Sequence, residues 1–473
     1  MDHVQAPTLR IVPGEPGHAG PPPPQHDARP REDPYPSQAG ATPWSKGGLP
    51  AHGRTLSVVV RERGFDGEGT RPRDGRPLQA VHGLAPERLE ELLAQTLDGD
   101  GPALLPVPAG TPRSRVRELL ATMRPSSVRT VDGVTRLDGG VPSRADTAVV
   151  ITTSGSTGVP KGVELSASAL LSSARASVAR IGAASGDAWL CVLPAGHISG
   201  IQVMIRALTM GTRAVHAAFS TDTMAELIED LRPHVSLVPT QLRRLLAAGT
   251  DLSPLRTVLL GGAAAEPALL QAARESVRVT TTYGMSETCG GCVYDGVPLE
   301  GVRVRVDSPT PGEPGRVLLA GPVLSSGYRL APGAREDPDA LTLDEEGVRW
   351  LRTNDLGRLG EDGRLHVLGR VDEVINTGGH KVVPGQVNAL LLEHPAVADS
   401  VVVGRPDPEW GERVSAVVVP VDRDAPPSLE RLRAWVGERL PSYAAPRELE
   451  VRDFLPLLAS GKPDLVALRG RSV

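Results

Sequence analysis

Four polar segments of this chain combine residue types that could do chemistry, and lysine marks two of them. Only four lysines occur among the 51 basic residues of the sequence. Lys161 and Lys462 each lie in a segment rich in glycine and polar residues. A lysine offers a compact ammonium group, whereas an arginine offers a broad planar fork. We therefore expect these two lysines to meet a phosphate or a reacting carboxylate in a tight space.

The first segment runs from Thr152 to Gly162 and directly follows an expected strand at 148–152. Its backbone N–H groups and hydroxyls could surround an anion, with Lys161 supplying the positive charge. Its spacing fits neither the P-loop pattern nor the dinucleotide pattern G-x-G-x-x-G. A glycine-rich surface turn is the alternative. Because strand, loop and lysine coincide, the segment favours phosphate binding.

The second segment, Thr281 to Thr288, again lies at the end of an expected strand, 279–283. Tyr283 offers a flat face for a base, and Glu287 offers a carboxylate for a metal ion that is also held by phosphates. Ligands of parallel sheets bind outside the carboxyl ends of the strands. We therefore expect the first two segments to face the same crevice.

The third and fourth segments lie in the C-terminal third. Asp355, in Thr353-Asn354-Asp355, could accept from both hydroxyls of a ribose, and Arg370 could reach the same sugar. An ordinary turn aspartate beside glycine is the alternative. Lys462 stands in Ser460-Gly461-Lys462-Pro463 near the C-terminus. Delivered onto a reacting carboxylate and phosphate, this lysine would stabilise the charge of a transition state.

Composition excludes several classes of function. The net charge of -5 is modest and basic residues are spread along the chain, so nucleic-acid binding is not expected. No run of 18 apolar residues predicts a membrane span. Three cysteines and a start without signal-peptide features favour the cytoplasm. Cys289 and Cys292 have redox spacing, but small residues at a turn explain the pair better than zinc or redox chemistry does.

The elements that must position these segments alternate between strands and helices, which predicts an α/β fold with a largely parallel sheet. The expected strands are 103–106, 148–152, 188–193, 235–238, 257–260 and 279–283, and the expected helices include 168–180, 201–210, 224–231 and 266–276. Short strands from 301 to 369 indicate a β-rich subdomain, and the rest of the chain predicts a separate α+β domain.

The domain boundaries follow from the same patterns. Residues 1–52 carry 12 prolines, so 1–76 is predicted to be a disordered Pro/Gly-rich extension. Order is expected to begin near Leu84. A large N-terminal domain then occupies 77–369, and a small C-terminal domain occupies 370–473.

Taken in order, the four segments resemble the adenylate-forming superfamily of acyl-CoA synthetases, luciferases and peptide-synthetase adenylation domains. The resemblance covers about residues 85–470. It implies that 77–369 binds ATP and an acid, and that 370–473 is a mobile lid. It also implies two steps: a carboxylate attacks the α-phosphate of MgATP to give an acyl-adenylate, and a thiol, usually of coenzyme A, then displaces AMP.

The resemblance also implies roles for single residues. Tyr283 would stack on adenine, Glu287 would bind Mg²⁺, and Asp372 would be the hinge. Lys462 would act in adenylation, and Gly378 and Gly379 would line the pantetheine tunnel. The residues implied in ATP binding are Thr153, Ser154, Gly155, Ser156, Thr157, Gly158, Lys161, Tyr283, Gly284, Asp355 and Arg370. Departures from the superfamily pattern at Asn354, Gln386, Asn388 and Leu465 leave these groups intact.

The stretch 193–206 is the best guide to the acid. Amino-acid-activating relatives carry an Asp early in this region, and none occurs here, so a cationic substrate is not expected. Together with 283–299 the stretch resembles the o-succinylbenzoate–CoA ligases of menaquinone biosynthesis. Their substrate has a succinyl carboxylate that is activated and an aromatic carboxylate that must be bound.

This second resemblance implies an acid site in the N-terminal domain. His197 would lie beside the reacting carboxyl group, and Gln202 would line the site. Gly290 and Gly291 would leave a slot for the ring, because any Cβ there would fill it. For the second carboxylate we propose Arg206 or Thr288, although an arginine after apolar residues is often a surface group.

Two other functions stay open. The chain could be another aryl- or acyl-CoA ligase or an adenylation enzyme that loads a carrier protein. It could also be a nucleotide-binding sensor without activity, although Lys161, Glu287, Asp355 and Lys462 together argue against that. A homodimer is expected from the resemblance alone.

Overall fold

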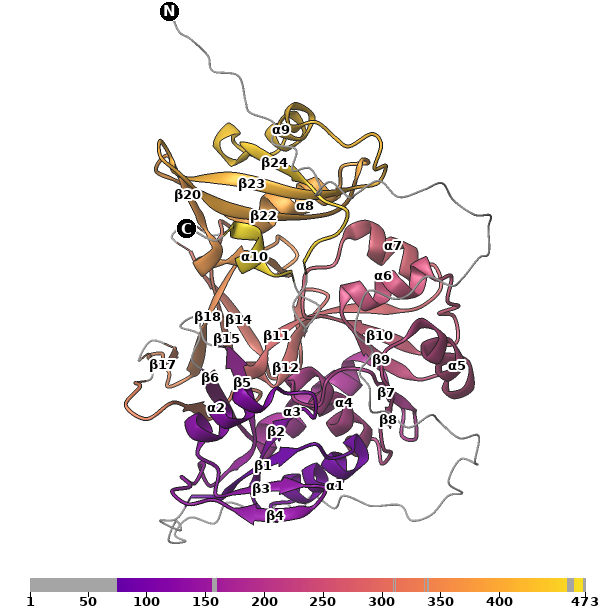
Figure 1. Cartoon of the computed structure of the whole chain (residues 1–473), viewed down its shortest axis with the longest axis vertical. Helices are drawn as coiled ribbons and strands as arrows, with labels where there is room; N and C mark the ends of the chain where they lie inside the picture. The colour runs from indigo at the N-terminus through magenta and orange to yellow at the C-terminus, as the bar shows by residue number, and fades with distance from the viewer. Residues whose placement is uncertain are drawn as a thin grey trace, which may run out of the picture. The chain divides into compact units, whose positions relative to one another are not determined.

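The computed structural model describes residues 75–154, 160–308, 310, 312–335, 337, 340–456 and 463–470 (Figure 1). Within these ranges the chain forms two compact units that divide between Asp372 and Glu373. Each unit is described by itself. Among the described residues, no helix is long and apolar enough to cross a membrane.

Two seven-stranded sheets form most of the N-terminal unit. The first has the order β16-β6-β5-β2-β1-β3-β4, and the second has the order β13-β12-β11-β10-β9-β7-β8. The first sheet comprises β16 (Gly327–Arg329), β6 (Pro160–Ser166), β5 (Thr147–Ser154), β2 (Ala103–Val107), β1 (Leu78–His82), β3 (Ser127–Thr130) and β4 (Gly133–Arg136). The second comprises β13 (Val297–Pro298), β12 (Gly290–Tyr294), β11 (Val279–Met285), β10 (Thr257–Leu260), β9 (His234–Leu237), β7 (Trp189–Cys191) and β8 (Val215–His216).

The middle strands of both sheets run parallel. Antiparallel pairs lie at both ends of the first sheet, where β3–β4 forms one end, and at one end of the second sheet. In the first sheet β5, β2, β1 and β3 are parallel neighbours, whereas β5–β6 and β6–β16 are antiparallel. In the second sheet the neighbours from β8 to β11 are parallel, and β11–β12 and β12–β13 are antiparallel. This arrangement confirms the predicted mixed α/β fold with largely parallel sheets.

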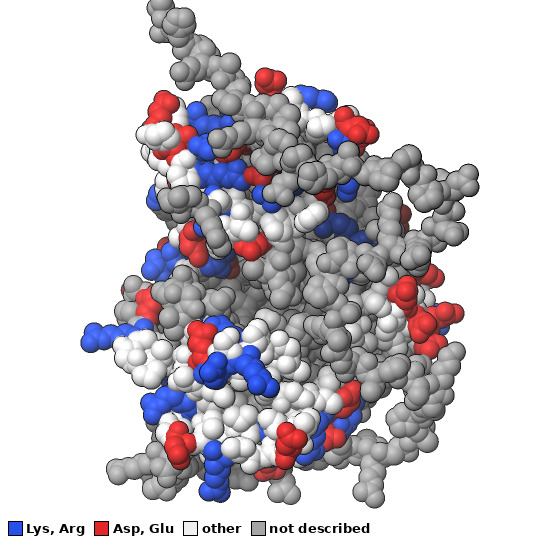
Figure 2. All heavy atoms as spheres, in the orientation of Figure 1, with Lys and Arg blue, Asp and Glu red and all other residues white. Residues whose placement is uncertain are grey.

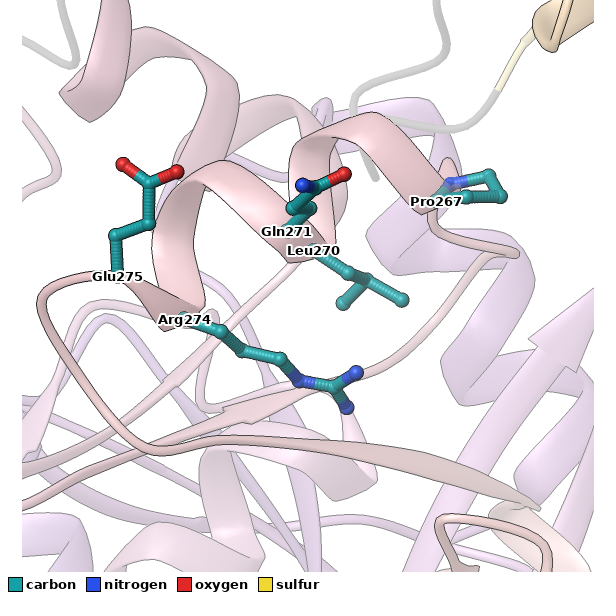
Figure 3. Close-up of a pocket in the computed structure, with 5 residues that line it drawn as sticks. All are labelled: Pro267, Leu270, Gln271, Arg274 and Glu275. Atoms are coloured by element: carbon teal, nitrogen blue, oxygen red, sulfur yellow. The ribbon is translucent and has the colours of Figure 1, made fainter.

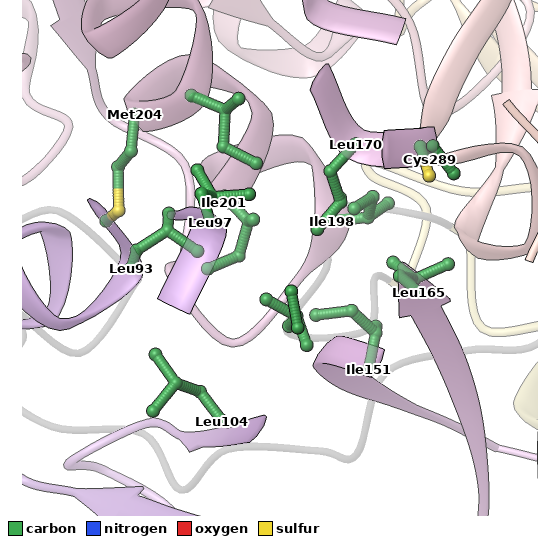
Figure 4. Close-up of a cluster of buried hydrophobic side chains, with 14 of the residues drawn as sticks. Leu93, Leu97, Leu104, Ile151, Leu165, Leu170, Ile198, Ile201, Met204 and Cys289 are labelled. Carbon is green, nitrogen blue, oxygen red and sulfur yellow. The ribbon is translucent and has the colours of Figure 1, made fainter. Parts of the chain in front are cut away.

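Two helices lie between the sheets and form the centre of the core. α3 (Ala167–Ile181) contacts β5 and β6 of the first sheet and β12 of the second, while α4 (Ile198–Thr209) contacts β7, β9 and β12. The Ser166 hydroxyl caps α3 by accepting from the Ala169 N–H, and Gly182 ends it with φ of +69°. Aliphatic side chains of α3, α4 and α1 (Pro86–Leu97) meet those of the first sheet (Figure 4).

The other helices of this unit cover outer faces of the two sheets. They are α2 (Arg113–Met123), α5 (Thr221–Leu231), α6 (Pro239–Ala247) and α7 (Pro267–Arg274). Apolar side chains of α5, α6 and α7 pack in one cluster with β7, β9, β10 and β11. These helices therefore hold the parallel strands from which β11 emerges.

A third sheet follows in the chain, as the short strands from 301 onward predict. Its order is β14-β15-β18-β17, with β19 also pairing with β18. The strands are β14 (Arg303–Asp307), β15 (Gly315–Ala320), β17 (Leu341–Leu343), β18 (Arg349–Leu359) and β19 (Leu365–Arg370). All their ladders are antiparallel.

The C-terminal unit is a small α+β unit around one sheet with the order β21-β20-β23-β22 and with β24 beside β23. Its strands are β20 (Ile375–Thr377), β21 (His380–Val382), β22 (Val397–Asp407), β23 (Gly411–Pro420) and β24 (Glu448–Val451). Its helices are α8 (Pro384–Leu392), α9 (Leu429–Gly437) and α10 (Leu465–Arg469), and η3 (Ser442–Ala444) is a single turn. The fold class of this unit is as predicted.

The start of the ordered chain was predicted wrongly. Order does not begin near Leu84, because β1 (Leu78–His82) is a central strand of the first sheet, paired with β2 and β3. Arg76, which the sequence assigned to the extension, forms a bridge with Ser143 and donates to the carbonyl of Thr147 at 3.1 Å. The run 78–82 is short and includes a glutamine, so its pattern alone did not show a strand. Residues 1–74 of the predicted extension lie outside the described residues.

The described surface carries interspersed charges. On the face in Figure 2, basic and acidic side chains alternate without gathering into one extended patch among the residues drawn in colour.

A buried titratable pair lies outside the four predicted segments. The His216 Nε2 atom in β8 lies 3.8 Å from a carboxylate oxygen of Glu90 in α1, and both side chains are almost fully buried. Burial by itself lowers the pKa of His216. Its contacts with Cys191 in β7 and with Glu90 outweigh burial, and raise the pKa to about 9. The folded protein therefore holds a charged imidazole against a buried carboxylate near neutral pH.

This pair predicts a loss of stability at alkaline pH. Because the folded pKa of His216 lies above the unfolded value of about 6.5, its stabilisation is complete below that value and is lost as the pH rises through about 9. The expected loss in the free energy of unfolding is at most about 3 kcal/mol. Urea denaturation from pH 6 to 10 should show it in the wild type but not in His216→Gln. Parallel profiles of the two proteins would contradict the role of His216.

Candidate active site

Lys161 stands near the turn end of a hairpin. β5 and β6 pair antiparallel, with Thr153 opposite Lys161 and Ser154 opposite Pro160. The residues that join the two strands, including the predicted phosphate-binding residues Gly155, Ser156, Thr157 and Gly158, lie outside the described residues, as does the side chain of Ser154. The strand ladder alone therefore places Thr153 and Lys161 side by side where the predicted phosphate loop leaves the sheet.

Lys161 meets Glu287 and a tyrosine from a third element. The Lys161 Nζ atom lies 3.4 Å from Glu287 Oε1 and 4.2 Å from the centre of the Tyr328 ring. The Tyr328 hydroxyl donates to the same oxygen of Glu287 at 3.0 Å. We call Lys161, Glu287 and Tyr328 the lysine–glutamate–tyrosine cluster. The first two predicted segments thus face each other, as expected.

Thr153 adds an oxygen beside this cluster. Its Oγ1 atom is buried and makes no hydrogen bond with any described residue. Mg²⁺ prefers oxygen ligands and is commonly bound by one or two carboxylates together with substrate phosphates. The Glu287 carboxylate, with only 12% of its side chain exposed, and the uncommitted Thr153 hydroxyl fit such an ion.

Glu287 is carried by a tight turn that Thr288 holds in place. The turn η1 (Ser286–Thr288) follows β11 directly. The fully buried Thr288 hydroxyl accepts from the Met285 N–H at 2.9 Å and donates to the Gly290 carbonyl at 2.7 Å. Thr288 was predicted as a possible ligand of a second carboxylate. Its hydroxyl proton is committed to the backbone and is not available to a substrate carboxylate.

Tyr283, at the end of β11, joins the second predicted segment to the third. Its hydroxyl donates to Asp355 Oδ2 at 2.7 Å. Burial and the neighbouring Asp355 carboxylate raise the pKa of Tyr283, so the phenol stays protonated and donates. Asp355 lies in β18 rather than in a turn, which was the alternative reading. The ladder of β18 with β19 shifts register between Leu356 and Gly357.

Arg370 connects Asp355 with the predicted hinge residue. In the ladder of β18 and β19 it lies opposite Asp355, and its NH1 atom is 3.5 Å from Asp355 Oδ1. Its Nε and NH2 atoms also donate to the two oxygens of Asp372, both at 2.8 Å. One guanidinium therefore bridges two acidic side chains. Asp372 lies in the turn η2 (Val371–Glu373), next to the boundary of the unit.

Three predicted acid-site residues belong to α4 or precede it. His197, with an exposed side chain, is the residue before the helix. Gln202 is buried, and its Nε2 atom donates to the Leu170 carbonyl at 3.3 Å while its Oε1 atom has no partner among the described residues. Arg206 follows Gln202 by four residues and so lies on the same face of α4.

Arg206 is buried rather than on the surface, which was the alternative. Only 6% of the residue is exposed. Its NH1 atom donates to the Ser236 hydroxyl at 3.2 Å, and its guanidinium lies 5.6 Å from the centre of the Trp189 ring. Its Nε atom has no hydrogen-bond partner among the described residues. A buried cation with a donor to spare is suited to an anionic ligand.

The predicted glycines lie on β11 and β12. A Cβ at Gly290, where φ is +93°, would lie 3.5 Å from Cγ of Gln202, so this glycine does face α4. A Cβ at Gly291 would meet Thr282 at 3.0 Å, and one at Gly284 would lie 2.0 Å from the Gly290 carbonyl oxygen. Packing between the two strands explains Gly291 and Gly284, whereas Gly290 is the one that approaches the predicted acid site.

The remaining predicted residues belong to other parts of the chain. Gly378 and Gly379 form the turn between β20 and β21, with φ of +57° and +81°. A Cβ at Gly378 would lie 2.4 Å from the Trp410 ring. Lys462 lies outside the described residues.

The two cysteines with redox spacing are buried in the N-terminal unit. Burial raises the pKa of Cys289 well above its usual range and the pKa of Cys292 to about 12. Both thiols therefore stay protonated and unreactive. No group of three or more His, Cys, Asp or Glu side chains in the described ranges is arranged to hold a metal ion.

A separate hollow lies on α7. Pro267, Leu270, Gln271, Arg274 and Glu275 line it (Figure 3). It shares no residue with the clusters around Glu287 and Asp355.

Tyr328 is the site residue that sequence reasoning missed. It stands in Ser325-Ser326-Gly327-Tyr328, within a stretch considered only for its short strands, and is one of just five tyrosines. β16 is three residues long and pairs with β6, which is more than 150 residues earlier in the chain. The scarcity of tyrosine was the one signal that could have drawn attention to it.

Comparison with known proteins is consistent with this geometry. The AMP-binding enzyme family matches residues 90–329, and the AMP-binding enzyme C-terminal domain matches 386–462. A probable 2-succinylbenzoate–CoA ligase of Mycobacterium tuberculosis is 41% identical over 408 residues, which cover 83% of this chain and 97% of the relative.

Solved structures give the same picture. The o-succinylbenzoate CoA synthetase of Bacillus subtilis in complex with its acyl-adenylate intermediate has a TM-score of 0.69 and 27% identity, covering 84% of this chain and 89% of that chain. The same enzyme in complex with ATP and magnesium ion has a TM-score of 0.68 and 28% identity, with the same shares covered.

Proposed function

Because the chain belongs to the AMP-binding enzyme family, we propose that it is an AMP-forming acid–CoA ligase that converts o-succinylbenzoate to o-succinylbenzoyl-CoA. The reaction has two steps. The succinyl carboxylate attacks the α-phosphate of ATP and releases pyrophosphate, which leaves an acyl-adenylate. The thiolate of coenzyme A then attacks the acyl carbon, and AMP leaves. This product serves menaquinone biosynthesis.

The observation that carries the proposal is the short segment from Tyr283 to Glu287. At one end Tyr283 holds Asp355, and at the other Glu287 meets Lys161. Together these residues offer an aromatic ring, a carboxylate that can accept from a ribose, and an ammonium for phosphates. Those are the parts of ATP in order. Lys462, a lysine proposed for the chemical step, is present in the sequence as well, which argues against a nucleotide-binding sensor without activity.

In the first step Lys161 would bind the β- and γ-phosphates, together with Thr153 and the loop up to Gly158. Glu287 would hold Mg²⁺, with the Thr153 hydroxyl available nearby. Bound there, the ion would neutralise phosphate charge that otherwise repels the incoming carboxylate. Asp355 and Arg370 would hold the ribose. Lys462 would place its ammonium on the reacting carboxylate and the α-phosphate.

In the second step the C-terminal unit would turn about Asp372. The division of the chain into compact units directly after this residue supports the hinge. Gly378 and Gly379 would then line the path of the pantetheine arm, since their lack of side chains and positive φ values leave a narrow turn. Such a movement lets one site serve two half-reactions in turn.

The acid would lie along α4. His197 would stand beside the reacting carboxylate, with Gln202 and Gly290 flanking the ring. Arg206 would bind the aromatic carboxylate, and its buried guanidinium with an unpartnered Nε atom supports that role. The 41% identity to the mycobacterial ligase supports the same acid.

Two further proposals concern location and assembly. We propose that the protein is cytoplasmic, because its three cysteines are free, as is usual in a reducing compartment. A homodimer rests on the resemblance alone.

Acid-dependent exchange of pyrophosphate into ATP tests the function. We expect exchange with o-succinylbenzoate, and none above background with benzoate, a medium-chain fatty acid or amino acids. Addition of coenzyme A should then give a thioester. Exchange with a different acid would keep the chemistry and reject the substrate. Silence with every acid, despite ATP binding, would favour a nucleotide sensor.

A further inference from the structure

Tyr328 contacts both charged residues of the proposed phosphate site through different parts of its side chain. Its hydroxyl donates to Glu287 Oε1 at 3.0 Å, and its ring lies under the Lys161 ammonium at 4.2 Å. The same Glu287 oxygen lies 3.4 Å from Lys161 Nζ. A single side chain thus touches the group proposed for Mg²⁺ and the group proposed for phosphate.

The strand that carries Tyr328 is firmly held. β16 pairs antiparallel with β6, with Tyr328 opposite Val163. The next residue, Arg329, is 8% exposed and donates to the carbonyls of Arg124 at 3.3 Å and Pro142 at 3.2 Å. Because neighbouring residues of a strand point to opposite faces, this anchoring fixes the direction of Tyr328.

The proposed function sets up a competition within the cluster. Phosphates would draw Lys161 away from Glu287, and a metal ion would compete with the ammonium for the carboxylate. The ion pair must therefore open whenever MgATP binds. The two contacts of Tyr328 are compatible with that opening. Its hydroxyl can stay hydrogen-bonded to Glu287 Oε1 while its ring face still attracts the Lys161 ammonium.

We propose that Tyr328 is a positioning residue with two separable parts: its hydroxyl orients Glu287 for Mg²⁺, and its ring holds Lys161 for the phosphates. This inference rests on the proposed function and deepens it. Loss of the hydroxyl alone should then weaken the response to Mg²⁺. Loss of the ring should also weaken the binding of ATP in the absence of the metal ion.

Two variants of Tyr328 separate the parts. Tyr328→Phe keeps the ring and removes the hydroxyl, and Tyr328→Leu removes both. Calorimetry gives the ATP affinity with EDTA and then with Mg²⁺, and exchange assays give the Mg²⁺ concentration for half-maximal rate. Tyr443→Phe removes a tyrosine hydroxyl from the C-terminal unit and serves as the matched control.

For Tyr328→Phe we expect ATP affinity in EDTA within about twofold of wild type, and a half-maximal Mg²⁺ concentration about tenfold higher. For Tyr328→Leu we expect the same metal effect and an affinity in EDTA about threefold weaker. If Tyr328 had a purely structural role, the ATP affinity in EDTA and the half-maximal Mg²⁺ concentration would change together in both variants.

Each alternative result overturns a stated part. A wild-type response of Tyr328→Phe to Mg²⁺ would refute the role of the hydroxyl. Equal ATP affinities of the two variants in EDTA would refute the role of the ring. If Tyr328→Leu does not fold, Tyr328→Phe alone decides the first part. Tyr328→Met, which also lacks an aromatic face, then tests the second part, and an ATP affinity in EDTA equal to that of Tyr328→Phe would refute the role of the ring. A wild type that binds no ATP would refute the proposed function itself, whatever the variants do.

Discussion

Replacement of Lys462 by Ala is expected to lower o-succinylbenzoate-dependent ATP–pyrophosphate exchange by at least about 100-fold. The ammonium would neutralise charge that builds on the carboxylate and the α-phosphate only as they react. Its loss should therefore lower the rate constant and change the affinity for ATP by less than about threefold. Exchange kinetics and calorimetry on the same preparation measure the two effects.

Two controls sharpen this result. Lys381→Ala removes another lysine from a glycine-rich segment of the sequence and should exchange pyrophosphate at the wild-type rate. Chemically prepared acyl-adenylate, supplied with coenzyme A, should still give thioester with Lys462→Ala, because the lysine is assigned to the first step alone. Unchanged adenylate formation would remove Lys462 from the proposed chemistry.

Replacement of Arg206 by Leu should remove the preference for the second carboxylate of the acid. We expect the KM for o-succinylbenzoate to rise about 100-fold, because a buried carboxylate would lose its charged partner. Benzoylpropionate, which keeps the ring and succinyl chain but lacks the ring carboxylate, should be used by the variant at least as well as by wild type. Exchange assays with both acids give the ratio directly.

The folding of the Arg206 variant and the shape of the guanidinium group each need a control. Arg206 also donates to Ser236, so thermal unfolding must show that the variant is folded. Arg206→Lys keeps the charge but not the fork and should give an intermediate KM. Arg175→Leu, at an exposed position of α3, should leave both acids unaffected. An equal loss with the two acids would show that Arg206 does not recognise the ring carboxylate.

Much of the fold followed from local pattern. Strands such as β10 (Thr257–Leu260) and helices such as α3 were predicted to within a residue or two, because buried apolar runs and capping residues are local signals. β1 was missed, although it is central. Its pairing partners come from later in the chain, and its buried Gln79 is satisfied by Ser127 at 3.0 Å. A short run that contains a polar residue can be assigned to a buried strand only when the hydrogen-bond partner of that residue is known.

The residues of the candidate site also divide into those that local sequence predicted and those that it did not. Lys161, Glu287, Tyr283 and Asp355 were predicted because each stands in a segment with an unusual composition, and the structure brings them into two contact clusters. Tyr328 stands in a short strand without such a composition. Arg206 was ambiguous for a related reason, since helical spacing places it on the apolar face of α4 but cannot say whether a cation there is partnered.

Arg370 has a consequence for how the two half-reactions are kept in order. It contacts both Asp355, proposed to bind ribose, and Asp372, proposed to bear the rotation. If both proposals hold, a change at one acid would alter the electrostatic partner of the other, and nucleotide occupancy would be thermodynamically linked to the torsion at Asp372. By reciprocity, whatever factor the nucleotide exerts on the orientation of the lid, the lid exerts on the affinity for the nucleotide. Release of AMP and the return of the C-terminal unit to its orientation for adenylation would then occur together as one step.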